Sequence, residues 1–124
     1  MKMRNDRASQ GDDRTIVEAI CQIMGIPLSS IEARYDEAGY LIDLALSHLG
    51  LTYLPSEIGQ LTRLERLHLN RNYFNALPRE IGRLTRLKLL GLSNNSLATL
   101  PPEIGQLACL ERLYPRDAQR AVKL

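Results

Sequence analysis

Apolar residues recur along this chain with a period of 23 residues. The segment LTRLERLHLN, which starts at Leu61, aligns with LTRLKLLGLS, which starts at Leu84, and 84 − 61 gives the shift of 23. Two dipeptides repeat at the same shift: Leu-Pro at 54, 77 and 100, and Ile-Gly at 58, 81 and 104. We therefore predict three full repeat units, 38–60, 61–83 and 84–106, followed by a partial fourth unit that begins at Leu107.

Each unit has the pattern of a short strand, a bend and a helical turn. Residues 64–69 alternate between apolar and polar, which predicts a half-buried strand. Asn72 and Asn95 follow the strands, where a buried amide can bond backbone groups of the neighbouring unit. Leu49 stands at this position in the first unit, so we expect the asparagine ladder to begin at Asn72. In 77–82 we expect a helical turn, with proline first, glutamate near its positive end and glycine closing it.

The units must stack to be stable. Burying seven apolar side chains contributes about 10–20 kcal/mol per unit, whereas ordering the backbone costs about 1–2 kcal/mol per residue. One unit therefore cannot fold alone, and stacking places parallel strands on one face and bulkier turns on the other, which curves the stack. The seven inward positions of the second unit are 61, 64, 67, 69, 74, 77 and 81.

The residues before the first unit predict a cap for the solenoid. Thr15 and Glu18 have the spacing of a capping box, and the apolar stripe after Thr15 predicts a helix that ends at Gly25. Residues 31–35 alternate in polarity and 36–39 have the composition of a turn, which predicts a hairpin over the first edge of the sheet.

The pattern divides the chain into four parts. These are a flexible N-terminal segment (1–13), a capping helix and hairpin strand (14–37), the repeats (38–114) and a C-terminal tail (115–124). Pro115 stands where earlier units have an inward leucine, and it cannot donate a sheet hydrogen bond, so we expect the repeats to stop there. The thin cap that this leaves keeps two alternatives open: a homodimer formed through the C-terminal end, or truncation from a longer repeat protein.

The consensus LxxLxLxxNxLxxLPxxIGxL, carried by residues from about Tyr40 to Leu113, resembles the intracellular 23-residue class of leucine-rich repeats. That class includes Ras-suppressor-like scaffolds and many bacterial repeat proteins. The resemblance implies an α/β solenoid, a short horseshoe arc with parallel strands on its concave face and short helical turns on its convex face. It also implies a module that binds proteins. Leu49 and Phe74 depart from the consensus, which fits local repacking.

Composition narrows the partner and the compartment. The chain has 16 basic and 14 acidic residues, interspersed, for a net charge of +2, which points to no polyanionic partner. No apolar run is long enough for a signal peptide core or a membrane span. Cys21 and Cys109 lack the spacing of a metal site or a disulfide framework, so we expect a reducing, cytoplasmic setting.

Outward strand residues form rows across the predicted sheet, and these rows hold the candidate site. Arginine, histidine and asparagine donors lie there beside Leu89, an open position at Gly91, and Tyr114. Since Arg and Tyr are frequent interface anchors, we expect this patch to grip an acidic or mixed polar segment of a protein or peptide. The alternative is that these side chains belong to an ordinary solvated surface. The candidate partner-binding residues are Asp43, His48, Arg66, His68, Asn70, Arg71, Leu89, Arg112 and Tyr114.

Other chemistry finds little support. We expect salt bridges along the row Glu65, Lys88 and Glu111, a buried Cys21, and an exposed Cys109 without an activating base. His48 and His68 are about 10 Å apart along the strand direction, too far to share a metal ion. No nucleotide, zinc-protease or hydrolase motif occurs, so we expect no enzyme and no cofactor.

Two further expectations concern partners. Acidic residues interrupt the arginines, so we expect no nucleic-acid partner. The strand face covers about 300 Å², which suits a peptide rather than a large protein surface. The alternative function is a structural or self-associating unit with no separate ligand.

Overall fold

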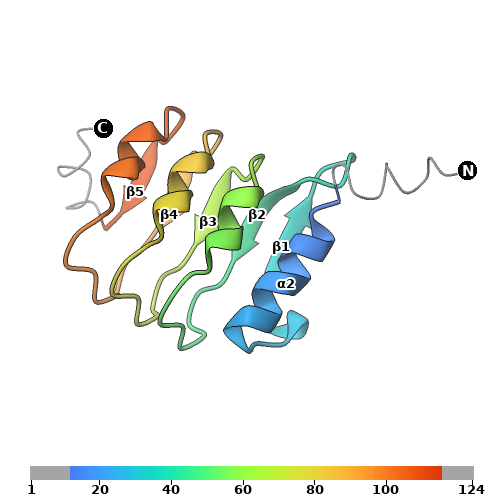
Figure 1. The fold of residues 1–124 in the computed structure, drawn as a ribbon, viewed down its shortest axis with the longest axis horizontal. Helices are drawn as coiled ribbons and strands as arrows, with labels where there is room; N and C mark the ends of the chain where they lie inside the picture. Colours follow the sequence, from blue (N-terminus) through green and yellow to red (C-terminus); the bar gives the residue numbers. More distant parts are fainter. Residues whose placement is uncertain (1–11, 116–124) are drawn as a thin grey trace, which may run out of the picture.

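Five strands form one sheet in their order along the chain. The computed structural model describes residues 12–115. The strands are β1 (Glu32–Tyr35), β2 (Leu41–Ala45), β3 (Arg66–His68), β4 (Leu89–Gly91) and β5 (Arg112–Tyr114). Strand β1 pairs antiparallel with β2, and the remaining pairs are parallel (Figure 1). This is the repeat solenoid that the 23-residue period predicts, with the hairpin expected at its first edge.

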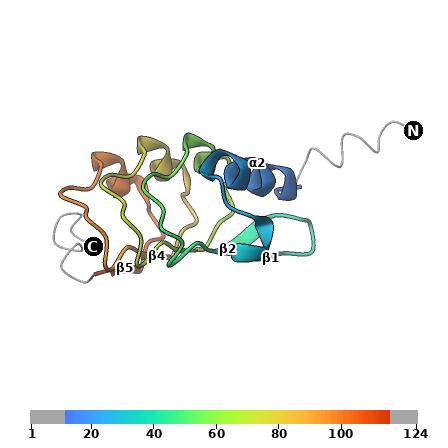
Figure 2. The same cartoon turned by 90° about the horizontal axis from the view of Figure 1, so that it is seen from below.

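Helices cover one side of the sheet and leave the other side open. Helix α2 (Arg14–Met24) is followed by the short 3₁₀ helix η1 (Leu28–Ser30), and each repeat then contributes one 3₁₀ helix. These are η2 (Ser56–Gln60), η3 (Arg79–Arg83) and η4 (Pro102–Gln106). Figure 2 shows the helical layer on one side and the strands on the other. We call the open side of the sheet the strand face.

The core lies between the two layers and consists of the predicted inward positions. Leu61, Leu64, Leu67, Leu69 and Ile81 are fully buried, as the alternating pattern requires. Phe74 and Leu77 are buried as well, and Phe74 is the largest side chain of the core to be wholly enclosed. The core therefore accommodates the Phe74 ring where the consensus has leucine.

Asn72 joins the first unit to the second, as the ladder predicts. Its Oδ1 accepts hydrogen bonds from the amides of Leu49 and Leu51, each at 3.0 Å, and its Nδ2 donates to the Leu46 carbonyl at 2.9 Å. Asn95 repeats this arrangement one unit later, where its Oδ1 accepts from the Phe74 amide at 3.0 Å. Each asparagine thus satisfies backbone groups in the bend of the preceding unit.

Glycine at 82 serves the packing of one turn on the next, which corrects the expectation that it closes the turn. Helix η3 continues to Arg83, so Gly82 lies inside it. A Cβ atom at 82 would lie 2.8 Å from Cβ and 2.9 Å from the carbonyl oxygen of Glu103 in η4. Pro78 likewise sits one position earlier than expected, because it precedes η3 in an extended conformation.

The start of helix α2 differs from the predicted capping box. The helix begins at Arg14, so Thr15 lies in its first turn, where its hydroxyl donates to the Asp12 carbonyl at 3.1 Å. The Asp12 side chain accepts a hydrogen bond from the Arg14 amide at 3.1 Å. The residue that bonds the first turn from outside the helix is therefore Asp12, and the predicted Thr15–Glu18 capping box is wrong. The predicted end is right: Gly25 has φ 71° and closes the helix in the left-handed conformation.

Candidate functional site

The structure confirms the outward rows on which the candidate site rests. Asp43, Arg66, Leu89 and Arg112 are successive partners across β2 to β5, and Ala45, His68, Gly91 and Tyr114 form the next row. The remaining candidates, His48, Asn70 and Arg71, follow the ends of β2 and β3. All nine candidate residues therefore lie along the strand face or at its margin.

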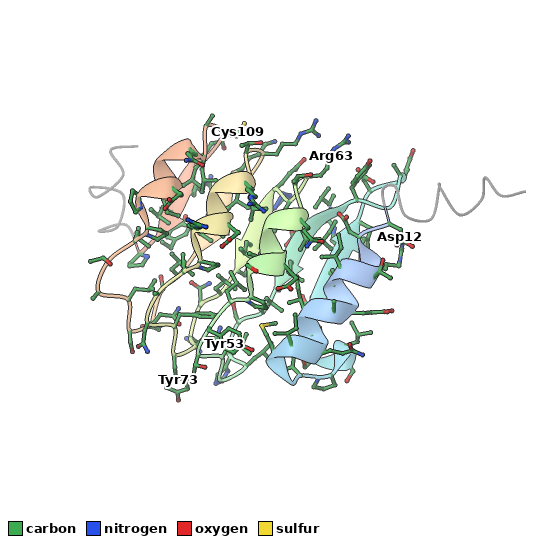
Figure 3. The ribbon with its side chains drawn as sticks, viewed as in Figure 1. Asp12, Tyr53, Arg63, Tyr73 and Cys109 are labelled. Atoms are coloured by element: carbon green, nitrogen blue, oxygen red, sulfur yellow. The ribbon has the colours of Figure 1, made fainter. Side chains whose placement is uncertain are left out.

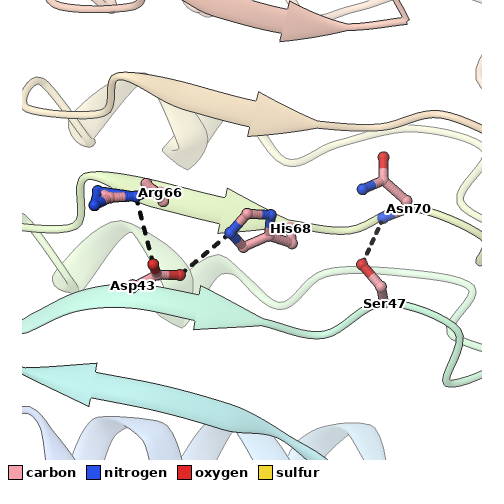
Figure 4. Close-up of polar contacts among 5 residues, drawn as sticks. All are labelled: Asp43, Ser47, Arg66, His68 and Asn70. Atoms are coloured by element: carbon pink, nitrogen blue, oxygen red, sulfur yellow. Dashed lines mark hydrogen bonds and ion pairs between the residues drawn. The ribbon is translucent and has the colours of Figure 1, made fainter.

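Asp43 is held between two of the predicted donors. Its Oδ1 lies 3.2 Å from His68 Nε2, and its Oδ2 lies 3.5 Å from Arg66 Nε (Figure 4). The Arg66 side chain is 41% exposed, so this ion pair is partly screened by solvent. Asp43 already engages Arg66 Nε and His68 Nε2, so these two side chains offer a partner fewer free donors than the sequence predicts.

Asn70 is a second link between repeats. Its amide donates to Ser47 Oγ at 3.1 Å (Figure 4), and its Oδ1 accepts from the Ser93 amide at 2.8 Å. The expectation of an open position at Gly91 is wrong, because Gly91 is buried and a Cβ there would lie 2.8 Å from Asn70 Nδ2. The Asn70 side chain covers the space that glycine leaves.

His48 and Arg71 occupy a strained position at the end of each strand. Their φ angles are both 59°, and Asn94, one repeat further on, has φ 61°. Residues other than glycine and asparagine rarely adopt this left-handed conformation. It turns the chain from the strand into the bend and leaves both side chains exposed at the margin of the strand face.

The last two strands carry the part of the face that described residues do not neutralise. Arg112 is exposed and forms no ion pair with a residue of the range 12–115. Leu89 lies beside it in the neighbouring strand, and Tyr114 lies two residues further along β5, in the same row as Gly91. This corner offers an apolar side chain, a cation and an aromatic ring together.

Sequence reasoning missed two residues of the face. Glu32 pairs in register with Ala45 and Arg34 with Asp43, so β1 extends both rows by one strand, and both side chains are exposed. Their alternation with the inward residues of β1 was the available signal. The repeat period does not extend to β1, which joins the sheet from the cap as an antiparallel neighbour of β2.

The predicted salt bridges of Glu65, Lys88 and Glu111 do not form. The backbone register is the expected one, since the Lys88 amide donates to the Glu65 carbonyl and the Glu111 amide to the Lys88 carbonyl, each at 2.8 Å. Within the part of the chain that the structure describes, however, the three side chains belong to no ion pair.

The described residues hold little reactive chemistry. Cys21 is buried in α2, and burial raises the pKa of its thiol, whereas Cys109 is exposed; neither is in a disulfide. From Asp12 to Pro115, no three His, Cys, Asp or Glu side chains gather closely enough to hold a metal ion. No helix in the same range is long and apolar enough to cross a membrane.

The fold defines a class of protein, the repeat solenoids with an open parallel sheet. Residues 39–123 match the family model described as a leucine-rich repeat region. The chain belongs to the leucine-rich-repeat family. Modules of this family generally serve in protein interaction.

Two solved structures show the same fold. A leucine-rich-repeat protein of Leptospira interrogans is 46% identical with a TM-score of 0.59, and the match covers 67% of this chain and 23% of that one. The leucine-rich-repeat ectodomain of the receptor kinase SOBIR1 from Arabidopsis thaliana is 21% identical with a TM-score of 0.61; the match covers 82% of this chain and 68% of that one. None of the curated proteins matches the chain.

Proposed function

We propose that this protein binds an extended segment of a protein partner on the strand face. The observation that carries the proposal is the corner formed by Leu89, Arg112 and Tyr114, where a cation without a described counterion lies beside apolar and aromatic surface. Arg and Tyr are the residue types that most often anchor interfaces. Arg71, exposed at the margin of the face, adds a second cation.

The charges suggest what the segment carries. An acidic side chain near Arg112 would gain a charge-assisted hydrogen bond, and an apolar side chain would cover Leu89. Arg66 and His68 contribute less, because Asp43 already engages both. Of the nine candidate residues, those of the last two strands, Leu89, Arg112 and Tyr114, therefore form the centre of the proposed binding site.

The size of the face supports a peptide-like ligand. The row through Arg34, Asp43, Arg66, Leu89 and Arg112 crosses five strands, which is about 19 Å. A standard interface buries roughly 800 Å² on each partner, more than such a face provides. One extended segment of a few residues fits it.

A displayed library of random 12-residue peptides tests this function. We expect selected peptides to share an acidic residue near an apolar one, and Arg112→Glu to weaken the selected peptide at least tenfold in calorimetric titration. Arg86→Glu, on an exposed turn away from the face, is the matched control and should leave binding unchanged. Selected peptides without acidic residues, or equal binding by both variants, would contradict the proposal.

A protein partner is favoured over a nucleic acid because acids are distributed over the face. Glu32, Asp43, Glu65 and Glu111 lie in or beside the same rows as the arginines, which breaks any continuous basic stripe. Weak retention on heparin at physiological salt is the expected result. Strong retention there would favour nucleic acid.

We further propose a non-enzymatic role in a reducing compartment such as the cytoplasm. Membership in a family of protein-interaction modules supports the role, and the two free cysteines, Cys21 and Cys109, suit a reducing compartment. Thiol labelling of the protein taken directly from its cell would test the compartment, since we expect Cys109 to react as a free thiol.

A further inference from the structure

The edge of the molecule at which the strands end carries almost no charge. This strand-end edge consists of four segments, 22–31, 47–56, 70–78 and 93–102. They contain no aspartate or glutamate, and their only basic side chains are His48 and Arg71. Charged residues make up 24% of the whole chain, so a neutral stretch of this length in every unit is a distinct surface feature.

The same edge collects the strongly exposed apolar and aromatic side chains of the described residues. These are Ile23 (42% exposed), Leu28 (49%), Tyr53 (50%) and Tyr73 (64%). Figure 3 shows Tyr53 and Tyr73 at one edge of the molecule, and Arg63 and Cys109 at the opposite edge. Apolar side chains gathered on one edge in this way are typical of an interaction surface.

Hydrogen bonds hold this edge in place before any partner arrives. The Tyr53 hydroxyl donates to the Ile23 carbonyl at 3.0 Å, which links the first repeat to the end of helix α2. The Tyr73 amide donates to the Leu51 carbonyl at 2.7 Å, which links the second repeat to the first. Because these bends are fixed, an interface formed by them needs little further ordering.

We propose that the strand-end edge is where two copies of this chain associate. The exposed polar side chains of the edge are mainly Tyr, Asn, Ser and Thr, which both donate and accept hydrogen bonds. A surface built from such groups is complementary to itself, as a two-fold interface requires, whereas carboxylates and guanidinium groups repel their own copies. Depletion of charge together with aromatic residues is also the composition of interface centres.

Charge argues against other occupants. A charged partner segment would find only His48 and Arg71, both at the margin toward the strand face, and no acidic residue. A membrane surface attracts proteins through clusters of basic residues beside apolar ones, and this edge has no such cluster. The uncharged edge of a second copy needs neither a charged counterpart nor a basic cluster.

The dimensions make this association weak. The four segments cover three strand spacings, about 14 Å, and the two layers are about 10 Å apart, so the edge is smaller than the roughly 800 Å² per partner of a standard interface. We expect dimers to appear only at about 0.1–1 mM. The edge meets the strand face at His48 and Arg71, whereas the corner formed by Leu89, Arg112 and Tyr114 lies outside its four segments.

Sedimentation velocity from about 10 µM to 1 mM tests the proposal. We expect a concentration-dependent dimer, weakened at least tenfold by Tyr73→Glu and by Leu28→Glu, because each change buries a pair of like charges in the dimer. Thr85→Glu adds the same charge at an exposed position of the opposite edge and is the control. Circular dichroism should show all three variants folded.

A second measurement locates the interface. Amide shifts that change with concentration should fall in the four segments of the strand-end edge. A protein that stays monomeric at 1 mM, or a dimer that both variants leave intact, would overturn the proposal. So would shifts confined to β5, which would instead indicate association through the C-terminal end. Peptide binding on the strand face can succeed or fail independently, because it depends on Arg112.

Discussion

The Asp13 carboxylate accepts a hydrogen bond from the Leu41 amide, with Oδ2 and N 2.7 Å apart. The Asp13 amide in turn donates to the Gly39 carbonyl at 3.1 Å. These two bonds fasten the start of helix α2 to the first repeat strand, and Asp13 is buried in doing so. The capping helix is therefore attached to the solenoid by one carboxylate at its N-terminus as well as by its apolar face.

Removing this carboxylate should loosen the cap. Asp13→Ala leaves the buried Leu41 amide without an acceptor, and we expect a loss of about 1–3 kcal/mol in the free energy of unfolding. Chemical denaturation measures it. Asp12→Ala, which removes only an exposed bond to the Arg14 amide, is the control and should cost less.

The same residue gives the protein a pH dependence of known sign. Burial raises the pKa of Asp13 above its ordinary value of 3.8, although the hydrogen bond from Leu41 opposes the rise. The folded state therefore holds the proton more tightly than the unfolded state, and stability falls as pH rises from 3.8 through the raised pKa. Asp13→Asn keeps an acceptor for Leu41 but does not titrate. The stability of the native protein relative to Asp13→Asn should thus decline over that window, and a difference independent of pH would refute this assignment.

Gly82 and Gly105 hold equivalent positions in successive repeats but should respond oppositely to alanine. At Gly82 the new Cβ meets the backbone of Glu103, and separating the two turns should cost about 1–3 kcal/mol. At Gly105 no atom of the described residues 12–115 lies within 4 Å of the new atom, so Gly105→Ala should stabilise by about 0.4–1 kcal/mol by lowering the conformational entropy of the unfolded chain. Thermal unfolding of the pair is informative because each variant is the control for the other.

Asn72 should be far more sensitive than its exposed neighbour Asn75. Asn72→Ala strands the amides of Leu49 and Leu51, and we expect a loss of about 2–4 kcal/mol. Asn75 is exposed and its side chain makes no hydrogen bond within the described structure, so Asn75→Ala should change stability by less than about 0.5 kcal/mol. If urea denaturation showed equal losses of unfolding free energy for the two variants, the hydrogen bonds of Asn72 would not stabilise the bend.

The left-handed backbone at Arg71 predicts a ranking of substitutions. Asparagine tolerates φ near 59°, so Arg71→Asn should match or slightly exceed the stability of the native protein. A β-branched residue does not, and Arg71→Val should lose about 1–3 kcal/mol. Lys88→Val, at an exposed position without a positive φ, controls for the loss of charge. If both valine variants behaved alike, strain at Arg71 would not be the cause.

The repeat period was enough to predict the strands, their register and the core. Inward positions such as Leu64 and Leu67 recur with the spacing of the strand, so one alignment places all of them. The asparagine ladder could be predicted for the same reason, since Asn72 and Asn95 recur at one position of the bend, where a buried amide side chain needs hydrogen-bond partners. These features depend only on contacts between equivalent positions of neighbouring units.

The sequence alone could not predict contacts between residues that hold different positions in their repeat units. The partner of Asp13 is 28 residues away in the first repeat strand, whereas the local sequence pattern predicts only a capping box at the start of the helix. The alternation of the strand predicts the outward position of Asn70, but its bond to Ser93 and the space it fills above Gly91 depend on the rotamer of one side chain. The pairing of Asp43 with both Arg66 and His68 needed the same information.

The asparagine bonds also give the solenoid a direction. The bend that contains Leu49 and Leu51 is completed by Asn72 from the next unit, and the Phe74 amide by Asn95 from the unit after it. This direction holds for the ladder asparagines and not for every bond between units, because backbone amides such as those of Lys88 and Tyr73 donate to carbonyls of the preceding unit. Deleting a unit from the C-terminal side would therefore leave the bend amides of the unit before it without their asparagine acceptor.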